Sequence, residues 1–141
     1  PRPYDLSFAN PLDVVPAANA FPDVTFVVPH FGAGFFRETL MAGKQCENVV
    51  VDTSSTNSWI HTQPQPTTLR DVFARALDVF GPDRMLFGTD SNVFPAGWRA
   101  ERLEEHRAIL EDLGLPRLEI ELVLGGNARR VLRRETAATP A

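Results

Sequence analysis

Three short apolar runs, each leading directly into polar residues, constrain the fold of this chain most. They occupy residues 24–29 (VTFVVP), 48–52 (NVVVD) and 84–88 (RMLFG). Each run is apolar at odd and even positions alike and is rich in β-branched or aromatic residues. That pattern is typical of strands covered on both faces, as in parallel sheets. We therefore predict three buried parallel strands.

Helical patterns separate and follow the runs. The clearest covers residues 68–80, where Thr68 and Asp71 resemble a capping box and Gly81 with Pro82 supplies a stop signal. Further helices are expected at 35–46, 100–113 and 127–134, and at 10–20 with a kink at Pro16. The alternation of strands and helices predicts an α/β fold with right-handed crossovers.

The sequence predicts both the start and the buried face of the last helix. Asn127 stands where an N-cap residue is expected, and Val131 and Leu132 are expected to be buried. The tail at 135–141 is expected to be frayed. We expect a single domain over residues 1–141.

Composition narrows the function classes. The chain has 141 residues and a net charge of −4, and its densest basic cluster, Arg129, Arg130, Arg133 and Arg134, fits a solvated helix face. Nucleic-acid binding is therefore disfavoured. The single cysteine, Cys46, allows no internal disulfide and fits a cytoplasmic protein. No apolar run approaches the roughly 20 residues that cross a membrane.

The strand ends carry the candidate active site. His30 follows the first run, Asp52 ends the second, and Asp90 comes two residues after the third. In parallel α/β folds the carboxyl edge of the sheet holds the active site. Imidazole and carboxylate groups at one edge suit metal ligation or general acid–base catalysis, so His30 and Asp90 are the main candidates. Asp52 could contact substrate or accept hydrogen bonds from its own loop.

Other polar and aromatic residues are weaker candidates. His61 could line a substrate pocket or lie on the surface, and Trp59, Phe94 and Trp98 could wall an apolar pocket or cap the core. His106 shares a helix face with Leu103 and Leu110 and is expected to pack inside. Cys46, between a helix and a strand at the opposite edge, is expected to be inert.

Several segments resemble one family of proteins. PDVTFVVPHFGAG, NVVVDTSS and GPDRMLFGTDSN resemble the sixth, seventh and eighth strands of the amidohydrolase-related metal-dependent hydrolases, and LGGNARRVL resembles their closing helix. This family includes zinc-dependent decarboxylases similar to aminocarboxymuconate-semialdehyde decarboxylase. The resemblance implies that the chain is the C-terminal part of a TIM barrel.

The resemblance also implies a divalent metal, usually zinc, that activates water or polarises the substrate. Asp90 would bind the metal or move a proton, and His30 would bind the metal or orient water. The family's His-x-His pair and fifth-strand histidine are absent from this chain. The metal site is therefore expected to be incomplete, because a catalytic zinc typically has three protein ligands.

A complete barrel of this kind needs about 250 residues and eight strands. We therefore expect the missing N-terminal half of the barrel, or another copy of the chain, to complete the fold. The expected activity is hydrolysis of a small carboxylated, cyclic or lactone-like substrate, with Arg99 pairing a substrate carboxylate and Trp98 near it. Two alternatives remain: a non-oxidative decarboxylase with the same metal, and a non-catalytic fragment that serves folding or association.

Overall fold

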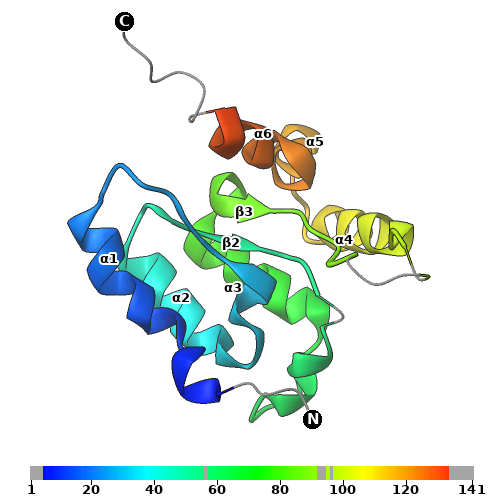
Figure 1. Ribbon diagram of the computed structural model, residues 1–141. Coiled ribbons are helices and arrows are strands. Elements are labelled where there is room, and N and C mark those ends of the chain that lie inside the picture. Colours follow the sequence, from blue (N-terminus) through cyan, green and yellow to red (C-terminus); the bar gives the residue numbers. More distant parts are fainter. Residues whose placement is uncertain (1–4, 56, 92–94, 96, 134–141) are drawn as a thin grey trace, which may run out of the picture.

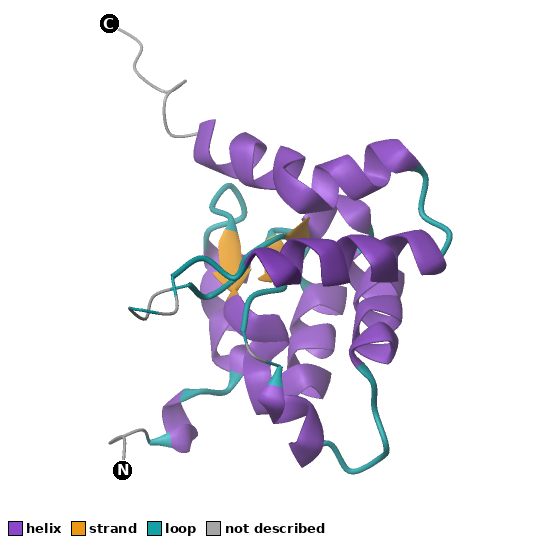
Figure 2. Cartoon of the chain, turned by 90° about the vertical axis from the view of Figure 1, so that its right-hand side faces the viewer, coloured by secondary structure: helices purple, strands orange, loops and turns teal. Residues whose placement is uncertain are grey.

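The computed structural model of the chain describes residues 5–55, 57–91, 95 and 97–133. Phe94 and the tail at 135–141, for which predictions were made, lie outside the described residues. Helices make up most of the described chain, and the strands form a small sheet that lies among them (Figure 2). Within these residues no helix is long and apolar enough to cross a membrane.

The sheet has three parallel strands, as predicted. They are β1 (Phe26–Val28), β2 (Val49–Asp52) and β3 (Met85–Leu86), in the order β1-β2-β3 (Figure 1). Val28 pairs with Val51, and Asp52 pairs with Leu86, so the strands end at nearly the same level. The observed strands are shorter than the predicted runs. β1 ends before Pro29, which has no N–H to donate to the ladder.

Helices connect and follow the strands. The α-helices are α1 (Val15–Ala20), α2 (Phe36–Gln45), α3 (Leu69–Phe80), α4 (Ala100–Asp112), α5 (Arg117–Glu121) and α6 (Asn127–Arg133). Short turns of 3₁₀ helix are η1 (Leu6–Phe8), η2 (Pro11–Val14), η4 (Ser58–Thr62) and η5 (Pro82–Arg84). The segment η3 (Pro29–Phe35) is an irregular turn, because its backbone is non-helical from His30 to Ala33. A π-helical segment, η6 (Leu122–Gly126), joins α5 to α6.

The helix starts agree with the sequence at two places. The Thr68 hydroxyl accepts from the Asp71 N–H while the Asp71 carboxylate accepts from the Thr68 N–H, which is the predicted capping box of α3. The break expected at Pro16 appears as a change from the 3₁₀ turn η2 to the α-helix α1. The sequence signal was local in both cases.

The C-terminal helices differ from the prediction. Asn127 is not an N-cap, because its own backbone is already helical, with φ −65° and ψ −43°, and the break before α6 lies at Gly125. Its side-chain amide instead donates to the carbonyl oxygens of Pro82 at 2.7 Å and Met85 at 2.8 Å, which ties α6 to β3. Leu132, expected to be buried, is 69% exposed, and α5 was not predicted. Figure 1 places α5 and α6 together beside β3.

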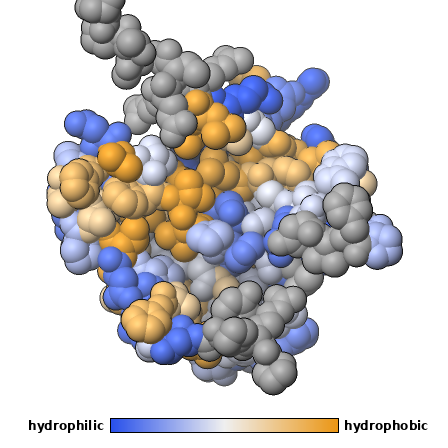
Figure 3. Space-filling view, viewed as in Figure 1, coloured by the Kyte–Doolittle hydropathy of each residue, from blue (hydrophilic) through white to orange (hydrophobic). Residues whose placement is uncertain are grey.

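The two faces of the sheet are covered differently. Alternate strand residues, among them Val49, Val51 and Met85, are buried in one core with residues of α2 and α3. Val27 belongs to the other face and is 44% exposed. Figure 3 shows apolar side chains gathered over the sheet on this side of the molecule. The sheet therefore has one packed face and one partly open face.

Candidate active site at the strand ends

The main polar cluster lies where β1 and β2 end. The Asp52 Oδ1 atom accepts from the backbone N–H of His30 at 2.9 Å and from that of Ser54 at 2.9 Å. The Ser54 hydroxyl donates to the same oxygen at 2.5 Å and lies 2.9 Å from His30 Nδ1. Thus one carboxylate oxygen holds both the backbone of His30 and the hydroxyl that touches its ring.

The backbone at His30 explains why this support is needed. His30, Phe31 and Ala33 have positive φ values of 60°, 53° and 50°, as does Gly32 at 79°. Such conformations are uncommon for residues with a Cβ, so a run of them is strained. The hydrogen bond from the His30 N–H to Asp52 and the burial of Phe31, which is 0% exposed, hold the segment in place.

Thr53, between Asp52 and Ser54, points to the opposite side of the strand. The Thr53 hydroxyl lies 3.2 Å from His106 Nδ1 and accepts from the Gly88 N–H at 3.4 Å. His106 is 1% exposed, and its ring lies 5.0 Å from that of Phe73. Burial lowers the pKa of His106 to about 4. The prediction of a packing histidine is therefore confirmed, although its link to Thr53 was not predicted.

Gly88 lets the exits of β2 and β3 approach closely. A Cβ atom at Gly88 would lie 2.8 Å from the Ser54 Cβ, closer than side-chain carbons come in proteins. The glycine that ends the third apolar run is therefore required by packing. Because Gly88 stands two residues before Asp90, the loop that carries Asp90 begins beside the cluster around Ser54.

Asp90 lies in the loop after β3, half-buried and with a positive φ of 53°. The loop is held by Ser91, whose hydroxyl lies 2.7 Å from that of Thr89 and accepts from the Arg99 N–H at 3.0 Å. Among the residues that the structure describes, no hydrogen bond or ion pair joins Asp90 to His30. The structure thus places both at the carboxyl edge without a direct bond between them.

The predicted substrate-binding residues have different surroundings. His61 lies on η4 and is exposed, and Trp98 is 65% exposed. Arg99 is partly buried, and its Nη1 atom is buried with no hydrogen-bond partner in the described part of the chain. A buried guanidinium nitrogen without a partner is one that an anionic group could satisfy.

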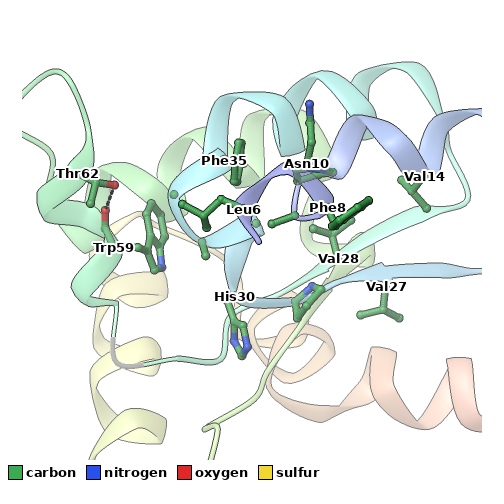
Figure 4. Close-up of a pocket in the computed structure, with 16 residues that line it drawn as sticks. Leu6, Phe8, Asn10, Val14, Val27, Val28, His30, Phe35, Trp59 and Thr62 are labelled. Carbon is green, nitrogen blue, oxygen red and sulfur yellow. Dashed lines mark hydrogen bonds between the residues drawn. The ribbon is translucent and has the colours of Figure 1, made fainter. Parts of the chain in front are cut away.

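An apolar cavity of about 700 Å³ opens beside β1 and extends to His30. Figure 4 shows Leu6, Phe35 and Trp59 on its walls and the His30 ring directed away from them, at one end. Trp59 is 8% exposed and also belongs to the core, so it both lines the cavity and caps the interior. Cys46, as expected, is buried away from this edge, between α2 and β2.

The described residues do not by themselves fit a metal ion. Within 5–55, 57–91, 95 and 97–133, no three His, Cys, Asp or Glu side chains come together as possible ligands. His30 and Asp90 would supply two ligands at most, fewer than a catalytic zinc typically has.

Ser54 and Thr53 were missed as functional candidates. The signal was present, because Asp52 and Ser54 are two residues apart and so share a face at the end of a strand. What the sequence could not show is that His30, 24 residues earlier, reaches the same hydroxyl.

Comparison with known proteins identifies the family. The family model described as amidohydrolase matches residues 2–134. The chain belongs to the amidohydrolase family. No curated protein matches the chain.

Solved structures of amidohydrolases share the fold. An amidohydrolase from Burkholderia multivorans with bound zinc is 23% identical, with a TM-score of 0.67 over 87% of this chain and 49% of its own. The 5-carboxyvanillate decarboxylase of Sphingomonas paucimobilis is 16% identical, with a TM-score of 0.55 over 90% of this chain and 39% of its own. The chain therefore spans about half the length, or less, of these structures.

Proposed function

We propose that this chain contributes His30 and Asp90 to the active site of a metal-dependent hydrolase that acts on a small carboxylated, cyclic or lactone-like substrate. The observation that carries the proposal is the cluster in which Asp52 and Ser54 hold His30 at the carboxyl edge of a parallel sheet. Family membership supports it, because the chain belongs to the amidohydrolases. We further propose that β1, β2 and β3 are the sixth to eighth strands of a TIM barrel.

The edge strands and the partly open face of the sheet support the proposal of a barrel. β1 and β3 are edge strands, and Val27 is 44% exposed, whereas Val50 and Leu86 on the same face are buried. Exposed apolar faces and unpaired edges are usually covered in stable proteins. The missing half of the barrel, or a second copy of the chain, would cover them. The remaining metal ligands would come from the same source, since the described residues do not complete a metal site.

The roles proposed for this chain are proton transfer and substrate binding. His30 would accept or stabilise a proton of the attacking water, and Asp90 would carry a proton to or from the substrate. Arg99 would pair a substrate carboxylate through the Nη1 atom that has no partner among the described residues. His61, Trp98 and Asp52 are proposed to border the substrate, with Asp52 acting through its hydrogen bonds to His30 and Ser54.

The test is an activity assay of the longest natural protein that contains this sequence. Lactones and carboxylated ring compounds are supplied, and addition of water is measured separately from release of carbon dioxide. Water addition supports the hydrolase, and carbon dioxide release supports the decarboxylase, whose fold is represented among the similar structures. Absence of both activities in a folded protein would support a non-catalytic fragment and overturn the proposal.

Asp90→Asn is the decisive variant. It removes the proton-carrying carboxylate while keeping the size of the side chain, so turnover should fall by about 10²–10⁴-fold, the usual contribution of a positioned acid–base group. The matched control is Asp78→Asn, at an exposed position of α3. Near-normal turnover in Asp90→Asn would remove Asp90 from the mechanism.

A further inference from the structure

We infer that Ser54 is a positioning residue that fixes which nitrogen of the His30 ring carries the hydrogen. The inference rests on the proposed function only for its effect on turnover. The hydrogen-bond pattern itself is a property of the folded chain. Asp52, Ser54 and His30 form a chain of side chains in which each group has a defined role as donor or acceptor.

The Asp52 Oδ1 atom acts only as an acceptor. Oδ1 accepts from the backbone N–H groups of His30 and Ser54, both at 2.9 Å, and an amide N–H can only donate. With two donors already directed at it, Oδ1 has no hydrogen to offer. The Ser54 hydroxyl, 2.5 Å away, must therefore donate its single hydrogen to Oδ1.

The Ser54 hydroxyl carries a single hydrogen. Once its hydrogen points to Asp52, the hydroxyl oxygen can only accept on its other side. His30 Nδ1 lies 2.9 Å from that oxygen, so Nδ1 must be the donor. In a neutral imidazole the other nitrogen, Nε2, then has a free lone pair. The side of the ring away from Ser54 thus offers an acceptor rather than an N–H.

Packing and hydrogen bonds hold both Ser54 and His30 in place. Ser54 is 7% exposed, and the backbone of Gly88 packs against its Cβ so closely that a Cβ on Gly88 would lie 2.8 Å away. The same Asp52 oxygen also holds the His30 backbone. Both ends of the histidine are therefore fixed to one carboxylate. A residue that orients another in this way sets its tautomer and direction without touching the substrate.

The tautomer can be measured directly. The longest natural protein that contains this sequence is labelled with ¹⁵N-histidine, and its ring spectra are recorded with a chelator at about pH 9, where imidazoles are neutral. We expect His30 to be in the Nδ1–H form. In Ser54→Ala the ratio of Nδ1–H to Nε2–H should fall about fivefold, as expected for one lost hydrogen bond.

Two controls make the result specific. His106, bonded to Thr53 on the other side of the strand, should keep its ring signals in Ser54→Ala. Ser55→Ala removes the neighbouring hydroxyl, which accepts from the Asn57 N–H, and should leave His30 unchanged. A predominantly Nε2–H ring in the unmodified protein would overturn the inference, even if Ser54→Ala failed to fold.

Kinetics of the same variants separate this inference from the proposed function. Ser54→Ala should lower kcat about tenfold or more with little change in KM, because the histidine is misaligned for proton transfer while binding groups remain. Equal kcat in Ser54→Ala and the unmodified enzyme would show that Ser54 does not act through His30. A protein without any activity would contradict the proposed function and leave the tautomer measurement to decide this inference.

Discussion

At the scale of single residues, the two histidines near the strand ends have opposite surroundings. Each is bonded to a hydroxyl, but His30 is half-buried beside a cavity, whereas His106 is 1% exposed and packed between the rings of Phe73 and Phe87. The His30 ring is accessible to a ligand, whereas the His106 ring becomes accessible only when the protein unfolds. Histidine content alone would not have separated them.

The burial of His106 predicts a pH dependence of stability. Its pKa is about 4 in the folded protein and 6.5 when unperturbed, so the unfolded chain takes up the proton more readily. Above pH 6.5 His106 is neutral in the folded and the unfolded chain alike, so the free energy of unfolding is at its full value. As the pH falls toward 4 the unfolded chain is protonated first, and the free energy of unfolding decreases. The free energy of unfolding should fall by about 3 kcal/mol between pH 7 and pH 4 from this residue.

Urea denaturation at several pH values measures this effect. His106→Gln should be less stable at pH 7 but should lose less stability on acidification. His61→Gln changes an exposed histidine and should keep the original pH dependence. If His106→Gln kept the original pH dependence of stability, the loss of stability on acidification would not come from His106.

At the scale of elements, α3 begins at a residue that the sequence specifies. The capping box of Thr68 and Asp71 satisfies N–H groups that the first turn leaves without partners. The helix then buries Val72, Phe73 and Ala76 against the sheet. A local signal thus fixes the start of the helix that covers the centre of the core.

Removing this cap should destabilise the protein without changing its active site. Thr68→Ala is expected to lower the free energy of unfolding by about 1 kcal/mol, the usual effect of losing an N-cap side chain. Thr67→Ala, which removes a hydroxyl that caps no helix, serves as the control. Chemical denaturation compares the two variants, and equal stability of both would mean that the cap contributes nothing.

At the scale of the whole molecule, the described chain is a three-stranded α/β unit with one partly open sheet face. β1 and β3 are edge strands, Val27 is 44% exposed, and the described residues bring no three candidate metal ligands together. The chain spans about half the length, or less, of the similar solved structures.

Metal binding by the chain of 141 residues alone should therefore be weak. Two side-chain ligands do not hold a catalytic zinc tightly, so titration calorimetry should give a dissociation constant above the micromolar range or no heat. The Asp90→Ala substitution should then change the dissociation constant for zinc little. Tight one-to-one binding that is lost in Asp90→Ala would contradict the view that the described residues leave the site incomplete.

The sequence by itself determined the three strands, most of the longer helices and the strand ends that carry the candidate residues. Apolar runs, the capping box at Thr68 and the break at Pro16 are local signals, because they depend on neighbours within a few residues. The same local signals are sufficient to place His30, Asp52 and Asp90 at strand ends. Family membership, expected from the same segments, was confirmed.

Only the tertiary structure decided which side chains meet. Ser54 reaches His30 across 24 residues, and Thr53 reaches His106 across 53, because packing of β1, β2 and α4 brings these segments together. The same packing turned Asn127 from an expected N-cap into a tie between α6 and β3. Hydrogen bonds between distant residues depend on the relative positions of whole elements, which local periodicity does not encode.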